Sequence, residues 1–268
     1  MSRYAIWVFL ALMRLAFPDN AMAAPSLAQD FQLWMQGALS AELPPRRLSF
    51  NADVNVRRGG GARLPIPGAE GIRVPSPHTQ IVIRPLLRYA LPHGLSVGAG
   101  YVYYPILYDD ALHRPSRNFH EHRAFSELTL GRALRRKIAF TGRMRLEHRF
   151  RSSGPGAISE AAERSPVAHR LRLFLRAERL LKEASGLHLV TFSETFFHLN
   201  ASAFTRGADF DQQRSFLGLA IDMGRRGRAE GGYLNQFIKT PSTQNWMNHA
   251  IFLILSVAVS HHREAESE

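Results

Sequence analysis

The segment at residues 138–150 reads IAFTGRMRLEHRF and alternates between two kinds of side chain. One set of positions holds Ile138, Phe140, Gly142, Met144, Leu146, His148 and Phe150, and the other holds Thr141, Arg143, Arg145, Glu147 and Arg149. Successive side chains of a β-strand point to opposite faces, whereas a helix of 3.6 residues per turn would spread these arginines around its circumference. The pattern predicts a strand with one apolar face and one charged face.

Ten further segments show the same character, and many of them are ten residues or longer. They lie at 31–40, 46–57, 80–91, 95–104, 119–131, 170–178, 187–200, 211–223, 229–238 and 247–259. Strands of soluble sheets are most often about five or six residues long, whereas a tilted strand that crosses a bilayer needs about 9–11. Long strands with one lipophilic and one polar face are typical of transmembrane barrels, in which closure pairs every backbone group. The sequence therefore predicts an all-β protein, an antiparallel up-and-down transmembrane β-barrel of 10–12 strands.

The connections between these segments alternate in length. Short ones lie at 91–94, 132–136, 182–186 and 224–228, and longer ones rich in Gly, Pro, Ser and Arg lie at 58–79, 105–118, 151–167 and 201–209. Short periplasmic turns and longer extracellular loops follow this rule in outer-membrane barrels. The ten segments from 46 to 259 then form a complete set with both ends in the periplasm, and 31–40 is left over. Because bacterial single-chain barrels have even strand numbers, we expect ten or twelve strands.

Composition excludes several classes of protein. The chain has 268 residues, and the 34 basic residues outnumber the 22 acidic ones, although only three of the basic residues are lysines. The absence of cysteine excludes a disulfide framework, a thiolate metal site and a cysteine-linked lipid anchor. The longest apolar run, Ala5–Met13, is shorter than the roughly 18 residues of a spanning helix. A helical membrane protein is therefore excluded.

The amino terminus predicts export from the cytoplasm. Arg3 precedes the apolar run Ala5–Met13, and Ala21-Met22-Ala23 matches a small-x-small cleavage site. We expect a signal peptide at 1–23, an N-terminal segment with a candidate first strand at 24–45, a barrel at 46–259 and a polar tail at 260–268. The expected location is the bacterial outer membrane.

An ordered series of short motifs resembles a known family, the domain-of-unknown-function 2490 family, regarded as bacterial outer-membrane β-barrels. The motifs are Phe31 with Trp34, Arg84-Pro85 with Tyr89, Gly98 with Gly100-Tyr101, Glu121 with Arg123, Arg143 with Leu146-Glu147 and Arg149-Phe150, Arg170 with Arg172, Glu194 with Phe196-Phe197, Phe210-Asp211-Gln212 with Arg214, and Gly232-Tyr233-Leu234-Asn235. The resemblance spans nearly the whole exported chain. It implies a location and a fold, but no activity.

The polar faces of the strands place many charges in the predicted lumen. These are the arginines Arg84, Arg88, Arg123, Arg143, Arg145, Arg149, Arg170, Arg172, Arg176 and Arg214, and the glutamates Glu121, Glu127, Glu147, Glu178 and Glu194. Isolated charges are too costly to bury, so these groups must pair or stay hydrated. The favoured interpretation is a closed barrel filled by a structural Arg–Glu network. The surplus of arginines leaves a narrow anion-selective pore, or a porin-like solute transporter, as an alternative.

Two further alternatives concern chemistry and location. An outer-membrane lipid-modifying enzyme would need a nucleophile beside a general base, and the His-x-Ser pair that supplies them on one strand face is absent. His120 and His122 share a strand face without a third metal ligand in register. We therefore predict no catalytic, metal or cofactor-binding residue. A soluble periplasmic lipid-binding β protein is the remaining rival, with its arginines facing water.

The expected partners follow from this location. They are outer-membrane lipid, the barrel-assembly machinery and a small anionic solute. Nucleic acid is not expected, because the arginines alternate within strands and do not form a basic run.

Overall fold

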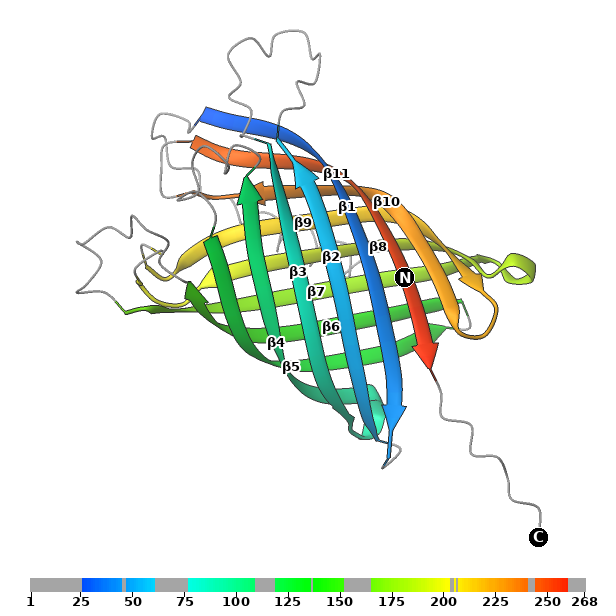
Figure 1. Cartoon of the computed structure of the whole chain (residues 1–268). Coiled ribbons are helices and arrows are strands. Elements are labelled where there is room, and N and C mark those ends of the chain that lie inside the picture. The colour runs from blue at the N-terminus through cyan, green and yellow to red at the C-terminus, as the bar shows by residue number, and fades with distance from the viewer. Residues whose placement is uncertain are drawn as a thin grey trace, which may run out of the picture.

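The computed structural model describes residues 26–44, 47–60, 77–108, 119–135, 137–151, 165–202, 205, 207–240 and 244–259. These residues form one closed barrel (Figure 1). Its strands are β1 (Ser26–Leu43), β2 (Leu48–Gly59), β3 (His78–Ala90), β4 (Leu95–Tyr108), β5 (Phe119–Arg135), β6 (Ile138–Arg151), β7 (Val167–Lys182), β8 (Leu187–His198), β9 (Asp209–Met223), β10 (Gly227–Ile238) and β11 (Gln244–Val259). Two 3₁₀ turns, η1 (Pro92–Gly94) and η5 (Glu183–Ser185), lie between strands. The described ranges contain no helix that is long and apolar enough to span a membrane.

The predicted fold class is confirmed, but the expected even strand number is wrong. Strands β2 to β11 follow one another around the barrel as antiparallel neighbours, and β1 closes it between β2 and β11. The leftover segment at 31–40 lies within β1, which pairs antiparallel with β2 and parallel with β11 (Figure 1). A parallel ladder pairs the backbone groups of both edges as an antiparallel one does. Closure with eleven strands therefore leaves no open edge.

The two ends of the barrel differ in the length of their connections. At the short-turn end, β1–β2, β3–β4, β5–β6, β7–β8 and β9–β10 are joined within a few residues. At the long-loop end, the connections β2–β3, β4–β5, β6–β7 and β8–β9 are longer. β1 runs from the long-loop end to the short-turn end. β11 runs in the same direction beside it, so the chain leaves the barrel at the short-turn end. The predicted signal at 1–23 and the tail at 260–268 lie outside the described residues.

The alternation seen in the sequence separates the inside of the barrel from the outside. On β6, Met144 and Phe150 are 48% and 44% exposed, whereas Arg145 and Glu147 are 1% and 0% exposed. The other strands repeat this arrangement, with large apolar side chains outside and charged ones inside. The barrel is thus the reverse of a soluble β-sandwich, which would bury its apolar face.

The interior also contains apolar clusters that the sequence analysis did not predict. The larger one consists of Trp34, Val190, Phe192, Phe216, Ala220, Leu234, Ala250 and Phe252, and the smaller one of Val82, Leu86, Val102 and Phe125. Glycines make room for two of the rings. The ring of Phe125 lies over Gly100, and the ring of Phe216 lies over the opposed pair Gly218 and Gly232. These glycines are needed because any side chain there would collide with a ring or with the neighbouring strand.

Candidate functional site

All members of the predicted charge network lie on the inward face, and each of its arginines has a carboxylate oxygen within 3.7 Å. Side chains on one face of adjacent strands stand opposite or diagonal to one another, so alternating Arg and Glu rows bring unlike charges together. The strand register therefore determines which arginine reaches which glutamate.

Glu147 on β6 is the most buried carboxylate of the network. Its Oε2 accepts hydrogen bonds from Nε and Nη2 of Arg170 at 2.9 and 2.6 Å, and its Oε1 accepts one from Nη1 of Arg172 at 2.5 Å. Arg170 also donates to Asp211 at 2.9 Å, and Arg172 donates to Glu194 at 2.7 Å. Three carboxylates on β6, β8 and β9 are thus linked through two arginines of β7.

Smaller groups complete the network on the other side of the lumen. Glu127 accepts hydrogen bonds from Nη2 of Arg145 at 2.6 Å and from Nη2 of Arg88 at 2.8 Å. Glu121 accepts from Nε of Arg123 at 2.7 Å and from Nε of Arg149 at 2.6 Å. Charge-assisted bonds of this length, often with two contacts per guanidinium, are the strong class of protein hydrogen bonds.

Several charged partners were missed by sequence reasoning. Asp53 accepts from Arg84 at 2.7 Å, Asp211 from Arg170 at 2.9 Å, and Glu230 from Arg176 at 2.5 Å. These carboxylates add negative charge to the lumen, but Arg57 and Arg151, which also line it, were missed as well, so a surplus of positive charge remains. Asp53 lies on the polar face of the predicted strand at 46–57, so alternation alone could have placed it in the lumen.

Aromatic rings pack against the guanidinium groups of many of the arginines. The guanidinium of Arg57 lies 3.9 Å from the centre of the Trp34 ring, that of Arg145 lies 4.0 Å from Phe125, and that of Arg172 lies 4.6 Å from Phe196. A cation over a ring is held by the ring's negative face without having its charge cancelled. These contacts fix the orientation of the guanidiniums inside the barrel without neutralising their charge.

Two cavities occupy the lumen. The larger, of about 830 Å³, extends to the long-loop end, where Asp209 and Lys239 line it. The smaller, of about 630 Å³, lies toward the short-turn end. Gln36, Arg84 and Arg143 line both, so a solute that moves from one to the other has to pass these three side chains.

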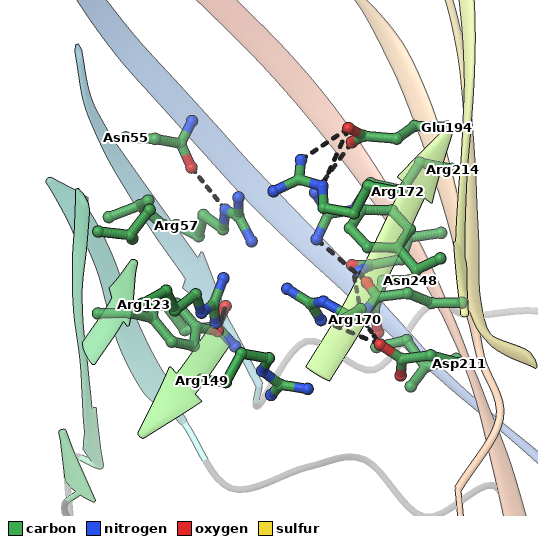
Figure 2. Close-up of a pocket in the computed structure, with 18 of the residues that line it drawn as sticks. Asn55, Arg57, Arg123, Arg149, Arg170, Arg172, Glu194, Asp211, Arg214 and Asn248 are labelled. Carbon is green, nitrogen blue, oxygen red and sulfur yellow. Dashed lines mark hydrogen bonds and ion pairs between the residues drawn. The ribbon is translucent and has the colours of Figure 1, made fainter. Parts of the chain in front are cut away.

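The wall of the long-loop cavity is strongly cationic. It contains ten arginines and Lys239 but only four carboxylates, Glu121, Glu194, Asp209 and Asp211. Figure 2 shows Arg57, Arg123 and Arg149 on one side of this space and Arg170, Arg172 and Arg214 on the other. Guanidiniums on opposite walls therefore face one another across the cavity.

Groups suited to catalysis or metal binding are sparse in the described part of the chain. The Nε2 atom of His198 lies 3.4 Å from Asp211, but no hydroxyl among the described residues is hydrogen-bonded to its imidazole. No group of three potential metal ligands occurs among these residues. His120 and His122 point outward, where they contact Tyr103 and Tyr101.

Comparison with known proteins identifies the family. The sequence profile described as "Protein of unknown function (DUF2490)" matches residues 31–248. The chain belongs to the DUF2490 family. An uncharacterized protein of Methylorubrum extorquens is 28% identical over 258 residues, which cover 96% of this chain and 99% of that one. No solved structure matches.

The motifs that carry the resemblance to DUF2490 contribute directly to the lumen. Four residues of these motifs line the long-loop cavity, namely Trp34, Arg172, Glu194 and Arg214. A fifth, Glu147, is buried and accepts a hydrogen bond from Arg172. In this DUF2490 barrel, the motifs thus supply both the ion-pair network and the wall of the larger cavity.

Proposed function

We propose that this DUF2490 protein is an outer-membrane β-barrel that binds small anionic solutes in its long-loop cavity. The short-turn end then faces the periplasm and the long-loop end faces the outside. Outer-membrane lipid surrounds the wall, and the barrel-assembly machinery inserts it. The Arg–Glu network keeps the wall in register, and the arginines in excess of carboxylates receive the solute.

The exterior of the barrel supports the membrane location. Large apolar side chains such as Leu217, Leu255 and Leu87 are half exposed or more on the outer surface. A surface of this kind, continuous around a closed sheet, suits hydrocarbon, because every backbone group is already paired. Apolar area on this scale is unusual for a protein that stays in water.

An outward-facing row of tyrosines and histidines supports the same orientation. Tyr101 pairs with His122, Tyr103 donates to or accepts from His120 at 2.8 Å, and Tyr233 pairs with His249. His120, His122 and His249 lie in the halves of their strands nearer the long-loop end, and their partners Tyr101, Tyr103 and Tyr233 lie near the middle of β4 and β10. Amphipathic rings concentrate where hydrocarbon meets the headgroups. We therefore place the outer interface of the membrane at this row.

The location predicts a simple result in cell fractions. We expect the protein in the outer-membrane fraction, and we expect the unheated sample to migrate on a detergent gel as a compact species that shifts after boiling, because a closed barrel resists detergent in the cold. A soluble protein in the periplasm with no heat-dependent shift would contradict the proposal.

The binding function rests on the excess of guanidiniums over carboxylates around a cavity of about 830 Å³. A concave site with one sign of charge and low-dielectric walls concentrates ions of the opposite sign. Arginine also offers a planar fork of donors that fits carboxylate and phosphate oxygens.

A series of solutes of similar size and different charge tests this function. With the purified barrel in detergent micelles, we expect calorimetry to detect gluconate binding that weakens as salt is added, and no binding of glucose or glucosamine. Glucosamine that binds as well as gluconate, or a barrel that binds none of the three, would contradict an anion-binding function.

A further inference from the structure

Arg57 on β2 differs from the arginines of the predicted network in having no carboxylate partner among the described residues. Its Nε donates to Oδ1 of Asn55 at 2.5 Å, and its guanidinium rests on the Trp34 ring at 3.9 Å. Both contacts are with neutral groups, so they fix the direction of the side chain and leave its positive charge uncompensated. Figure 2 shows Arg57 reaching from its wall into the cavity toward Arg172 and Arg214.

Arg214 on β9 approaches the same indole ring from another strand. Its guanidinium lies 5.3 Å from the centre of Trp34 and 4.7 Å from that of Phe196, and its Nη2 donates to Gln212 at 3.1 Å. Its carboxylate contact is with Glu194 at 3.7 Å, a distance beyond hydrogen bonding. Glu194 also accepts hydrogen bonds from Arg172 and Arg143, so three arginines share its single negative charge.

The two guanidiniums lie over the same indole ring. Their central carbons lie 3.9 and 5.3 Å from the same ring centre, so no more than the sum of these distances separates them. Like charges at this separation repel each other in a cavity with low-dielectric walls, unless an anion lies between them. The fold nevertheless holds both in place through neutral neighbours.

A third donor belongs to the same wall. Asn55 is 2% exposed and lines the cavity, and its Nδ2 has no hydrogen-bond partner among the described residues. Oδ1 of Asn55 accepts a hydrogen bond from Arg57, and this bond fixes the orientation of the amide. The NH₂ of the same amide is left without an acceptor among the described residues. Buried donors are normally satisfied, so an unsatisfied one next to the guanidinium of Arg57 indicates a missing acceptor.

We propose that Arg57, Arg214 and Asn55 bind the phosphate group of a phosphorylated small solute. This inference rests on the proposed anion-binding function and specifies its ligand class. A carboxylate carries one charge on two oxygens, whereas a phosphate monoester carries up to two charges and three free oxygens on a tetrahedral centre. Two guanidinium forks on separate strands, neither of them hydrogen-bonded to a carboxylate among the described residues, and a third donor match that charge and that number of oxygens. The cavity beyond them has room for the organic part of the solute.

Calorimetry of the full-length exported barrel with three anions tests the ligand class. Inorganic phosphate and glucose 6-phosphate both present the phosphate group, and gluconate presents a carboxylate on a chain of similar size. We expect both phosphates to bind at least about tenfold more tightly than gluconate, since each oxygen gains a charged donor. Tighter binding of glucose 6-phosphate than of inorganic phosphate would identify an organic phosphate as the ligand. Tighter binding of inorganic phosphate would identify the free ion.

Two substitutions test the residues. Arg57→Gln and Arg214→Gln should each weaken phosphate binding at least about tenfold, because each removes a charged fork from the oxygens. The matched control is Arg58→Gln, which removes the same charge from the next residue of β2, where the exposed side chain donates to Thr79 at 3.1 Å. That control should change the dissociation constant by less than about twofold. The fluorescence of Trp34 provides an independent readout, since phosphate binding alters the two guanidiniums over its ring.

The possible failures are distinguishable. If the wild-type barrel binds gluconate as tightly as glucose 6-phosphate, and both arginine variants keep wild-type affinity, the phosphate site is refuted while anion binding stands. If the wild-type barrel binds no anion, the proposed function itself is refuted. The heat-dependent gel shift of each variant shows whether the barrel is intact before binding is measured.

Discussion

Replacing Glu147 by alanine is expected to lower the free energy of unfolding of the barrel by about 3–5 kcal/mol. Glu147 is 0% exposed and accepts three hydrogen bonds from Arg170 and Arg172. Without it, Arg170 retains Asp211 and Arg172 retains Glu194, but both guanidiniums lose a fully buried carboxylate partner. Removing one partner of a buried charge pair is costly because the other charge stays buried and uncompensated.

Urea unfolding in detergent micelles, followed by tryptophan fluorescence and extrapolated linearly, measures this loss. The control is Glu183→Ala in the turn between β7 and β8, where an exposed carboxylate lies 3.1 Å from Lys137. That exposed pair should contribute less than about 1 kcal/mol. Equal unfolding midpoints for the two variants would show that the interior network does not stabilise the wall.

Replacing Gly232 by valine is expected to destabilise the barrel by about 3 kcal/mol or more, because the added atoms meet backbone and an immobile ring. A Cβ at this position would lie 2.5 Å from Cα of Gly218, 2.8 Å from Cζ of Phe216, and closer still to the carbonyl oxygen of Leu217. Gly218 stands directly opposite Gly232 on β9, so the two strands would have to separate to admit a side chain.

The same substitution at another strand glycine is the control. Gly37 lies on β1 facing outward, and a Cβ there would meet nothing within 4 Å. Gly37→Val should leave the stability unchanged or slightly raised, since valine is favoured in strands. A loss of stability as large for Gly37→Val as for Gly232→Val would mean that valine at either position acts through strand geometry in general, and that the close approach of β9 and β10 has no special role.

Alternation along the sequence predicted the strands and the inward position of the charged network, but not the apolar clusters inside the barrel. On β6, the charged set and the apolar set of 138–150 are separated as expected. The pattern could not predict which strands pair with β1. Alternation is a property of one segment, whereas pairing depends on segments that are far apart in the sequence. The segment at 31–40 carries the same two faces as its neighbours, and nothing local distinguishes a parallel closing strand from an antiparallel one.

For the candidate site, the positions of residues in the lumen could be predicted, but the contacts across the lumen could not. Arg170, Arg172 and Glu194 were assigned to the lumen from their positions within strands, but the pairing of Arg176 with Glu230 crosses from β7 to β10. Contacts across the lumen depend on how the barrel curves, which the sequence does not display. The aromatic rings beneath the arginines were missed for a related reason. Phe174 of β7, for example, lies against the guanidinium of Arg143 on β6, and this contact depends on the pairing of the two strands.

The parallel seam between β1 and β11 limits how this chain can be rearranged. In a barrel closed by antiparallel first and last strands, the two ends meet at one rim, and a short peptide can join them for circular permutation. Here Ser26 lies at one rim and Val259 at the other, and 16 residue pairs separate the rims along the seam. At about 3.3 Å per residue, that seam is about 50 Å long. A peptide that joins these two ends would have to run along the outside of the barrel or through the lumen, and it would need about 15 extended residues. The order in which the strands follow one another along the chain is therefore difficult to change.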